Sequence, residues 1–129
     1  MVNLADVADP TVLVADDDRG CRRAVREALE TVGIRTYPAS SGRRAIAVIR
    51  RRRVHVGIFD LHMPEMSGLD AIRFLRQERI YVPVIVMTSD PTGGLEERAL
   101  SEGAVSLLLK PIDLGVIRDA VRVAFEKYV

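Results

Sequence analysis

Carboxylate side chains follow two of the short apolar runs in this sequence. The first run, residues 11–15, is followed by Asp16, Asp17 and Asp18, and the third, residues 54–59, is followed by Asp60. Ionised carboxylates that lie within a few ångströms of one another repel, which raises the pKa of one or more of them unless a cation joins them. Mg²⁺ relieves this repulsion, because it binds one or two carboxylates and keeps several waters. The aspartates are therefore candidate magnesium ligands.

Two further runs are followed by side chains that could bind an anion. Thr88 and Ser89 follow the fourth run, residues 82–87, and Lys110 follows the fifth, residues 105–109. Thr88 offers a hydroxyl donor and Lys110 a compact ammonium. Carboxylates, a metal ion, an ammonium and a hydroxyl together make a phosphoryl-transfer site, in which a carboxylate attacks phosphorus and the cations neutralise the equatorial oxygens.

Each of these residues also has a purely structural interpretation. An aspartate after a strand commonly caps the next helix, which is what we expect of Asp18. Asp60 alone fits a turn, Thr88 fits a strand, and a Lys-Pro pair fits a surface turn. The functional interpretation rests on the joint placement, because four strand ends each carry a matching group.

The segments between the runs predict that strands and helices alternate. Short valine-rich runs are typical of buried strands, and apolar residues at helical spacing predict a helix after each strand. We expect strands at residues 11–15, 34–39, 54–59, 82–87 and 105–109, and helices at about residues 19–32, 42–52, 68–79, 95–102 and 114–128. The apolar stripe of the last helix is expected to be Leu114, Ile117, Val121, Ala124, Phe125 and Tyr128.

This alternation predicts an α/β fold with a parallel sheet and helices on both faces. Such sheets are doubly wound with right-handed crossovers, and periodicity alone leaves both common strand orders open. In either order, ligands bind beyond the carboxyl ends of the strands. The residues that follow the strands are therefore expected at the edge where ligands bind.

Composition predicts one ordinary soluble domain. The chain has 129 residues, of which 48% are hydrophobic and 29% are charged, values that argue against disorder. A net charge of +1 argues against a strongly basic nucleic-acid-binding chain. The single cysteine, Cys21, excludes an internal disulfide and favours the cytoplasm. The sequence contains no run of about 20 apolar residues, so no membrane span is predicted. The first ten residues do not resemble a signal peptide.

The strand-end motifs resemble the receiver domain of bacterial response regulators, including the chemotaxis receivers. The matching segments are residues 12–18 (VLVADDD), 59–69 (FDLHMPEMSGL), 83–89 (PVIVMTS) and 103–111, which begin with Gly-Ala and end with Lys-Pro. Residues 1–9 are then expected to form an N-terminal extension and residues 10–129 the receiver domain. The resemblance implies a flavodoxin-like doubly wound sheet of five parallel strands in the order 2-1-3-4-5.

The resemblance also implies a phosphoacceptor and its metal. Asp60 resembles the aspartate that takes a phosphoryl group from a sensor histidine kinase or a phosphotransfer protein. Asp17, Asp60 and the backbone carbonyl of His62 would bind Mg²⁺ directly, while Asp16 would act mainly through water. The ring of His62 is expected to face solvent.

Further implied roles concern the bound phosphoryl group. Thr88 would hydrogen-bond to it, Lys110 would pair with it, and the small Ser89 would leave room for it. The Lys110-Pro111 bond is expected to be cis. Leu107 is an atypical switch position, because the family usually has Tyr or Phe three residues before this lysine. The structural interpretation is that Leu107 is a core leucine, and we expect the loop at residues 90–95 to carry the switch with Thr88.

The predicted function is a signalling phosphoacceptor of a two-component system, with only weak self-phosphorylation and self-dephosphorylation. The Asp-x-Asp pair that begins at Asp16, with a downstream lysine, also fits a Mg²⁺-dependent phosphohydrolase with Asp16 as nucleophile. Against this, no cap domain or substrate pocket fits in the chain. A second alternative is a pseudo-receiver that is never phosphorylated, against which the intact aspartate, threonine and lysine set argues.

The sequence does not identify the kinase or the output protein. We expect neither direct nucleic-acid binding nor a membrane contact, and a homodimer through the last two helices and the fifth strand is an open alternative to a monomer. Residues 50–53 are four consecutive arginines at a predicted helix end. Such a run is usually a solvated face that complements the helix dipole, and the alternative is a patch for an acidic partner.

Overall fold

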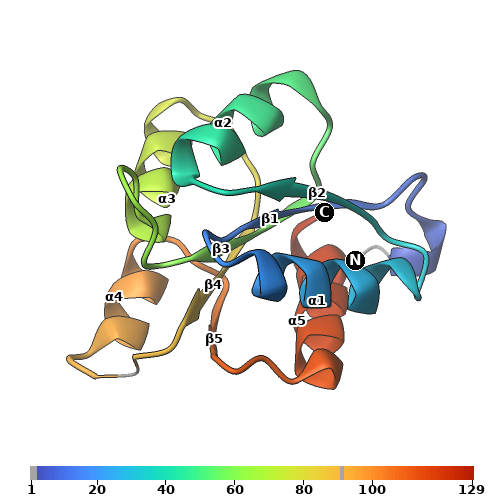
Figure 1. The fold of residues 1–129 in the computed structure, drawn as a ribbon. Helices are drawn as coiled ribbons and strands as arrows, with labels where there is room; N and C mark the ends of the chain where they lie inside the picture. Colours follow the sequence, from blue (N-terminus) through green and yellow to red (C-terminus); the bar gives the residue numbers. More distant parts are fainter. Residues whose placement is uncertain (1–2, 91) are drawn as a thin grey trace.

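Five parallel strands form one sheet in the order β2-β1-β3-β4-β5, with helices on both faces (Figure 1). The computed structural model describes residues 3–90 and 92–129. Met1 and Val2 of the expected extension, and Pro91 of the expected loop, lie outside the described residues. The strands are β1 (Thr11–Ala15), β2 (Arg35–Ala39), β3 (Val56–Asp60), β4 (Val84–Thr88) and β5 (Ser106–Leu109). The implied doubly wound α/β fold and its strand order are confirmed.

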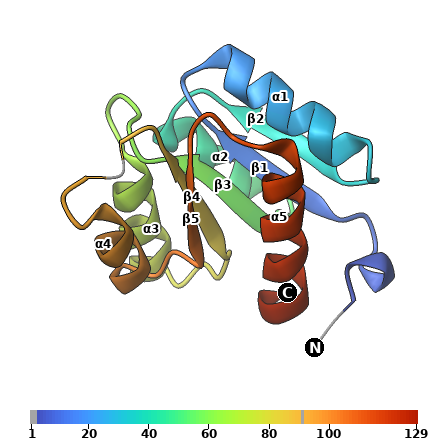
Figure 2. The ribbon, with the colours of Figure 1, turned by 90° about the horizontal axis from the view of Figure 1, so that it is seen from below.

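A helix follows each strand, and a short 3-10 helix, η1 (Leu4–Asp6), precedes β1. The α-helices are α1 (Arg19–Glu30), α2 (Gly42–Arg51), α3 (Gly68–Gln77), α4 (Leu95–Ser101) and α5 (Leu114–Tyr128). Helices α1 and α5 cover one face of the sheet, and α2, α3 and α4 cover the other (Figures 1 and 2).

The central strands are buried on both faces, which explains their continuous apolar sequence. In β1, Leu13 and Ala15 pack under α2 and α3, while Val12 and Val14 pack under α1 and α5. This alternation is the period of two that a strand imposes on its side chains. The two apolar layers hold the strands rigidly, so the residues at their carboxyl ends are firmly placed.

Polar side chains cap four of the α-helices. The Asp18 carboxylate accepts hydrogen bonds from the backbone N–H groups of Gly20 and Cys21, as expected of a helix cap. Ser41, Ser67 and Asp113 cap α2, α3 and α5 in the same way. Helix α4 has no side-chain cap, because it begins after Gly94, whose φ is +68°.

The helix predictions were wrong at several ends, and α3, which we expected to reach residue 79, ends at Gln77. Helix α1 ends at Glu30, and Val32, which we placed in it, is 52% exposed. In α5, Ile117, Val121, Ala124 and Phe125 are buried, but Leu114 and Tyr128 are 41% and 56% exposed. The ends of α5 are exposed because the helix is longer than the strands it covers. A helix of 15 residues extends about 22 Å, whereas strands of five residues extend about 16 Å. Both ends of α5 therefore project beyond the sheet.

No helix within the described ranges has the length and hydrophobicity needed to cross a bilayer.

Candidate functional site

Three aspartates meet at the carboxyl ends of β1 and β3. These strands are neighbours, and Ala15 is paired with Phe59, so Asp16 and Asp60 leave the sheet side by side. Carboxylate oxygens of Asp16, Asp17 and Asp60 lie within 4.8 Å of one another. Asp16 and Asp60 are buried and Asp17 is exposed.

The Lys110 ammonium lies against two of these carboxylates. Its Nζ is 2.7 Å from Oδ2 of Asp16 and 2.8 Å from Oδ2 of Asp60. The backbone places it there, since Lys110 N–H donates to the Thr88 carbonyl at 2.7 Å and so extends the β4–β5 pairing. The Lys110-Pro111 bond is cis, as the resemblance implied.

Burial and charge act against each other on the pKa values of Asp16 and Lys110, and both pKa values are raised. Burial raises the pKa of Asp16 above its ordinary value, although the Lys110 ammonium and the Asp18 N–H partly offset this. Burial alone would lower the pKa of Lys110, but the ion pairs with Asp16 and Asp60 outweigh it and raise that pKa. The ammonium therefore stays charged at neutral pH and partly neutralises the two carboxylates.

The donor set fits a hard divalent cation. Three carboxylates supply oxygen ligands, which Mg²⁺ prefers. Within the described residues, the buried Oδ2 of Asp16 accepts no well-aligned hydrogen bond, although the Lys110 ammonium lies beside it. An oxygen of this kind can accept a further cation or a water bound to one.

Thr88 is fully buried at the end of β4, and its hydroxyl has three polar neighbours. The hydroxyl donates to the Asp90 carbonyl at 3.2 Å and accepts from the Asp90 N–H at 3.0 Å. The third neighbour is Nε2 of His62, at 3.2 Å, and the His62 N–H donates to Oδ1 of Asp60 at 3.0 Å. His62 thus connects the Asp60 carboxylate to Thr88.

The expectation for the His62 ring was therefore incomplete, because the exposed ring also contacts Thr88. No sequence signal could have indicated this contact, since it joins residues 26 positions apart and depends on how the loops fold over the strand ends. The two bonds between Thr88 and Asp90 are local, of the kind that a threonine hydroxyl commonly makes at a turn.

The two remaining predicted site residues lie at the margin of the site. Ser89 is exposed and lines a hollow of about 460 Å³ that Lys110 and Cys21 also line, between α1 and the segment after β5. Leu107 is half-buried, pairs with Val86 of β4, and packs against the apolar layer under α2, α3 and α4. It therefore lies at the margin of that layer and is not one of its fully buried residues.

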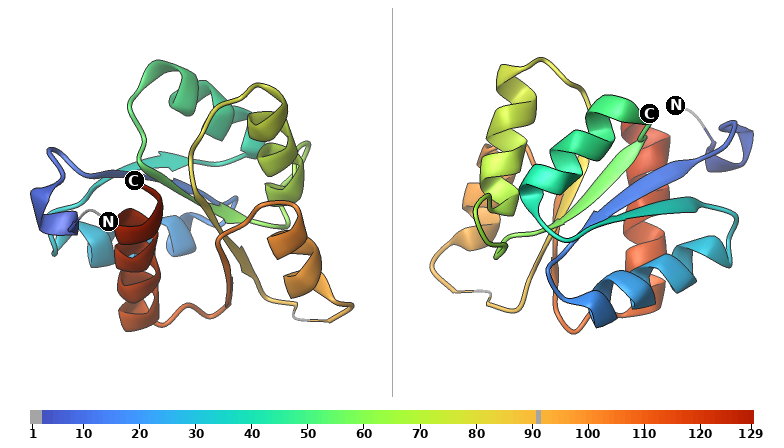
Figure 3. Two further views of the ribbon diagram at one scale, coloured as in Figure 1. Left: turned by 180° about the vertical axis from the view of Figure 1, so that it is seen from behind. Right: turned by 45° about the horizontal axis from the view of Figure 1, so that its top comes forward.

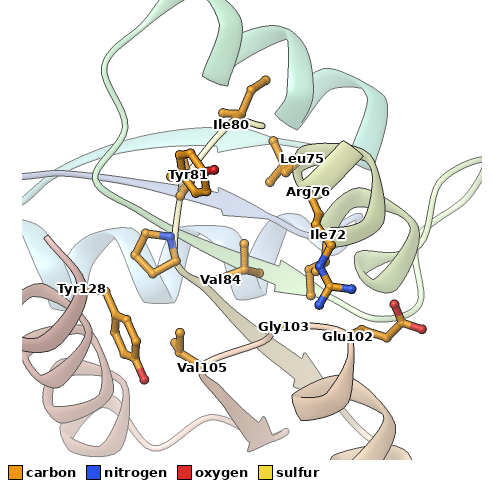
Figure 4. Close-up of a pocket in the computed structure, with 12 residues that line it drawn as sticks. Ile72, Leu75, Arg76, Ile80, Tyr81, Val84, Glu102, Gly103, Val105 and Tyr128 are labelled. Carbon is orange, nitrogen blue, oxygen red and sulfur yellow. The ribbon is translucent and has the colours of Figure 1, made fainter. Parts of the chain in front are cut away.

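A separate apolar hollow of about 430 Å³ lies at the opposite end of the sheet (Figure 4). Its lining includes Ile72, Leu75, Val84 and Val105, with Tyr81 and Tyr128 at the rim. It contains none of the predicted site residues. The predicted site residues therefore gather at the carboxyl edge and not in this hollow.

Comparisons with known proteins point to one family. Residues 12–122 match the family model described as the response regulator receiver domain. The sensor histidine kinase RcsC of Escherichia coli is 30% identical over 124 residues, which are 96% of this chain and 13% of the kinase. The sporulation initiation phosphotransferase F of Bacillus subtilis is 27% identical over 86% of this chain and 90% of its own length. Among solved structures, the receiver domain of Francisella response regulator 1452 has a TM-score of 0.86 at 28% identity, covering 92% of this chain and 98% of that domain.

Proposed function

Since this chain belongs to the response regulator receiver domain family, we propose that Asp60 is its phosphoacceptor in a two-component signalling system. The donor is a sensor histidine kinase or a phosphotransfer protein, and the reaction depends on Mg²⁺. One observation carries the proposal, namely that the Lys110 ammonium lies 2.8 Å from Asp60 at an edge that also holds Asp16 and Asp17. Residues 10–129 form the receiver domain of this proposal.

Each residue has one part in the transfer. A carboxylate oxygen of Asp60 attacks phosphorus, an O–P bond forms, and the bond between phosphorus and the donor nitrogen breaks with its electron pair going to the donor. Asp17, Asp60 and the His62 carbonyl would hold Mg²⁺, which neutralises charge on the phosphoryl oxygens when bound, and Asp16 acts mainly through water. Lys110 neutralises a further share of that charge.

Thr88 and the loop after it carry the signal. After transfer, the Thr88 hydroxyl turns to a phosphoryl oxygen and gives up its bonds to Asp90. The loop can follow, because Gly93 and Gly94 already have φ values of +72° and +68°, a conformation that glycine adopts without strain. Leu107 has no ring or hydroxyl to move into the space that Thr88 leaves, so it contributes little to the change.

The test is intact mass after incubation with acetyl phosphate and Mg²⁺. Wild type should gain about 80 Da, the mass of one phosphoryl group, and Asp60→Asn should not. Asp18→Asn is the matched control, because Asp18 belongs to the same aspartate row but caps α1, and it should be phosphorylated like wild type. Chelation of the metal with EDTA should abolish the adduct in wild type and in Asp18→Asn.

The same experiment distinguishes the two alternatives. An adduct that persists in Asp60→Asn and disappears in Asp16→Asn would indicate the phosphohydrolase. The geometry does not favour it, because Asp16 is 0% exposed and its Oδ1 accepts the Asp18 N–H at 2.9 Å. No adduct in wild type would indicate a pseudo-receiver.

A further inference from the structure

Charge is divided very unevenly along this nearly neutral chain. Residues 19–53 contain 11 arginines and two acidic residues, a net charge of +9. The rest of the chain contains eight basic and 16 acidic residues, a net charge of −8. A net charge of +1 therefore conceals a strongly basic part of the molecule, formed by α1, β2 and α2.

The arginines of this part gather around the free edge of the sheet. Helices α1 and α2 lie on either side of β2 (Figure 3, right). A hollow of about 350 Å³ is lined by Pro38 and four arginines of α1, and a second of about 400 Å³ continues from it past Pro38 to α2. We call these arginines the basic face: Arg19, Arg22, Arg23 and Arg26 of α1 and Arg44 of α2.

The arginines of the basic face are only partly neutralised. Arg23 and Arg26 pair with glutamates one turn later in α1, at 3.5 and 2.8 Å. In the part of the chain that the structure describes, Arg19, Arg22 and Arg44 have no carboxylate within 4.0 Å. Arg22 is held in place by its Nη1, which donates to the Asp16 carbonyl at 2.7 Å.

This arrangement opposes the electrostatics of its own helix. At the start of α1 the N-cap Asp18 is the one acidic residue, and Arg19, Arg22 and Arg23 place positive charge at the positive end of the helix dipole. Arginines three and four positions apart on one helix also repel one another. An anionic surface placed over the basic face would relieve both effects.

The free edge of β2 does not favour the addition of a strand from a partner. The Arg35 N–H donates to the carbonyl of Pro10, which directly precedes β1. The backbone N–H and C=O groups of the odd-numbered residues of β2 therefore point towards β1. Pro38 therefore faces the free edge, where it has no N–H to offer. The edge therefore favours a partner that binds through side chains.

The neighbouring carboxylates favour a protein over a nucleic acid. Arg19 directly follows Asp18, and Asp16, Asp17 and Asp60 lie at the same end of the sheet. Duplex DNA carries a charge about every 1.7 Å of its length, so a duplex that covered the basic face would also approach these carboxylates. A protein can place its acidic side chains against the arginines alone.

We propose that the basic face binds an acidic patch of a protein partner. The guanidinium groups of Arg19, Arg22 and Arg44 bind aspartate or glutamate carboxylates. Each planar guanidinium can donate two parallel N–H hydrogen bonds to one carboxylate. The interaction does not require phosphorylation of Asp60.

The probe is a fluorescein-labelled decaglutamate peptide, with binding followed by fluorescence anisotropy. The test variant is Arg19→Glu/Arg44→Glu, which leaves the structurally engaged Arg22 in place. The matched control is Arg79→Glu/Arg98→Glu, two exposed arginines outside the basic face. Both double variants shift the net charge equally.

Wild type should bind the peptide at about 20 mM salt, and affinity should fall about tenfold or more at about 200 mM, where screening shortens the Debye length. The test variant should lose about tenfold or more in affinity, and the control less than about threefold. Both should still be phosphorylated by acetyl phosphate, which separates this proposal from that for Asp60. If the test variant does not fold, Arg19→Gln/Arg44→Gln takes its place.

Three outcomes would overturn the proposal. The first is no peptide binding by wild type at low salt. The second is an equal loss in the test variant and the control, which would show a response to net charge alone. The third is tighter binding of a 20-base-pair DNA duplex than of the peptide, which would make the basic face a nucleic-acid surface.

Discussion

Gly68 is the first residue of α3 and lies directly against the backbone of the phosphoacceptor. A Cβ atom at this position would be 2.7 Å from the Asp60 carbonyl oxygen, 3.2 Å from its carbonyl carbon and 3.3 Å from Cα of Leu61. All three atoms belong to the backbone, so no side-chain rotation can relieve the contact. Gly68→Ala must therefore move the start of α3 away from the end of β3.

The geometry sets the size of the effect. Ordinary contacts of a Cβ atom begin at 3.4 Å, so the start of α3 must shift by about 0.7 Å relative to Asp60. Overpacking of this kind, which forces the backbone to move, costs about 1–3 kcal/mol. The better helix propensity of alanine offsets little of this, because it applies to helix interiors and Gly68 is the first residue of α3. We expect Gly68→Ala to lower the free energy of unfolding by about 1–3 kcal/mol.

Urea unfolding followed by circular dichroism measures this difference, and the rate of Asp60 phosphorylation shows whether the displacement reaches the site. Gly20→Ala in α1 is the matched control, since the nearest atom to its Cβ is a carboxylate oxygen of the Asp18 side chain at 3.3 Å. The control should be as stable as wild type. A Gly68→Ala protein with unchanged stability and phosphorylation rate would refute the reasoning.

Three further predictions concern titration and charge. Burial lowers the pKa of His55 below its ordinary 6.5. On acidification the unfolded chain therefore takes up the proton at a higher pH than the native protein does. The free energy of unfolding should then fall as pH drops below about 6.5. His55→Asn, whose amide oxygen can still accept the Thr11 N–H, should flatten this dependence in urea midpoints at about pH 7.5 and pH 5.5. Burial raises the pKa of the Cys21 thiol to about 12, so iodoacetamide should alkylate it at least about tenfold more slowly in the native than in the unfolded protein, and equal rates would contradict this. Lys110→Arg should slow phosphorylation by acetyl phosphate about ten- to a hundredfold, because a planar guanidinium cannot replace an ammonium that contacts both Asp16 and Asp60. A normal rate would show that phosphorylation does not depend on this ammonium.

The type of each β-strand and each α-helix could be predicted from the sequence, because it depends on residues a few positions apart, whereas the short helix η1 was not predicted. The run at residues 11–15 became β1 with the predicted bounds, and Asp18 and Asp113 cap the helices that follow them. The charged groups at the strand ends could be predicted for the same reason, because they directly follow the strands in the sequence. The strand order could not, since periodicity allowed two orders and the resemblance to receiver domains selected 2-1-3-4-5.

Only the tertiary structure decided which side chains meet. The contact between His62 and Thr88 joins residues 26 positions apart, and the basic face joins arginines from two helices on opposite faces of the sheet. The exposure of Leu114 and Tyr128 likewise depends on how far α5 extends beyond the strands. Local patterns decide whether a segment is a helix or a strand, whereas distances between such segments depend on register, helix length and packing, which no single stretch of sequence encodes.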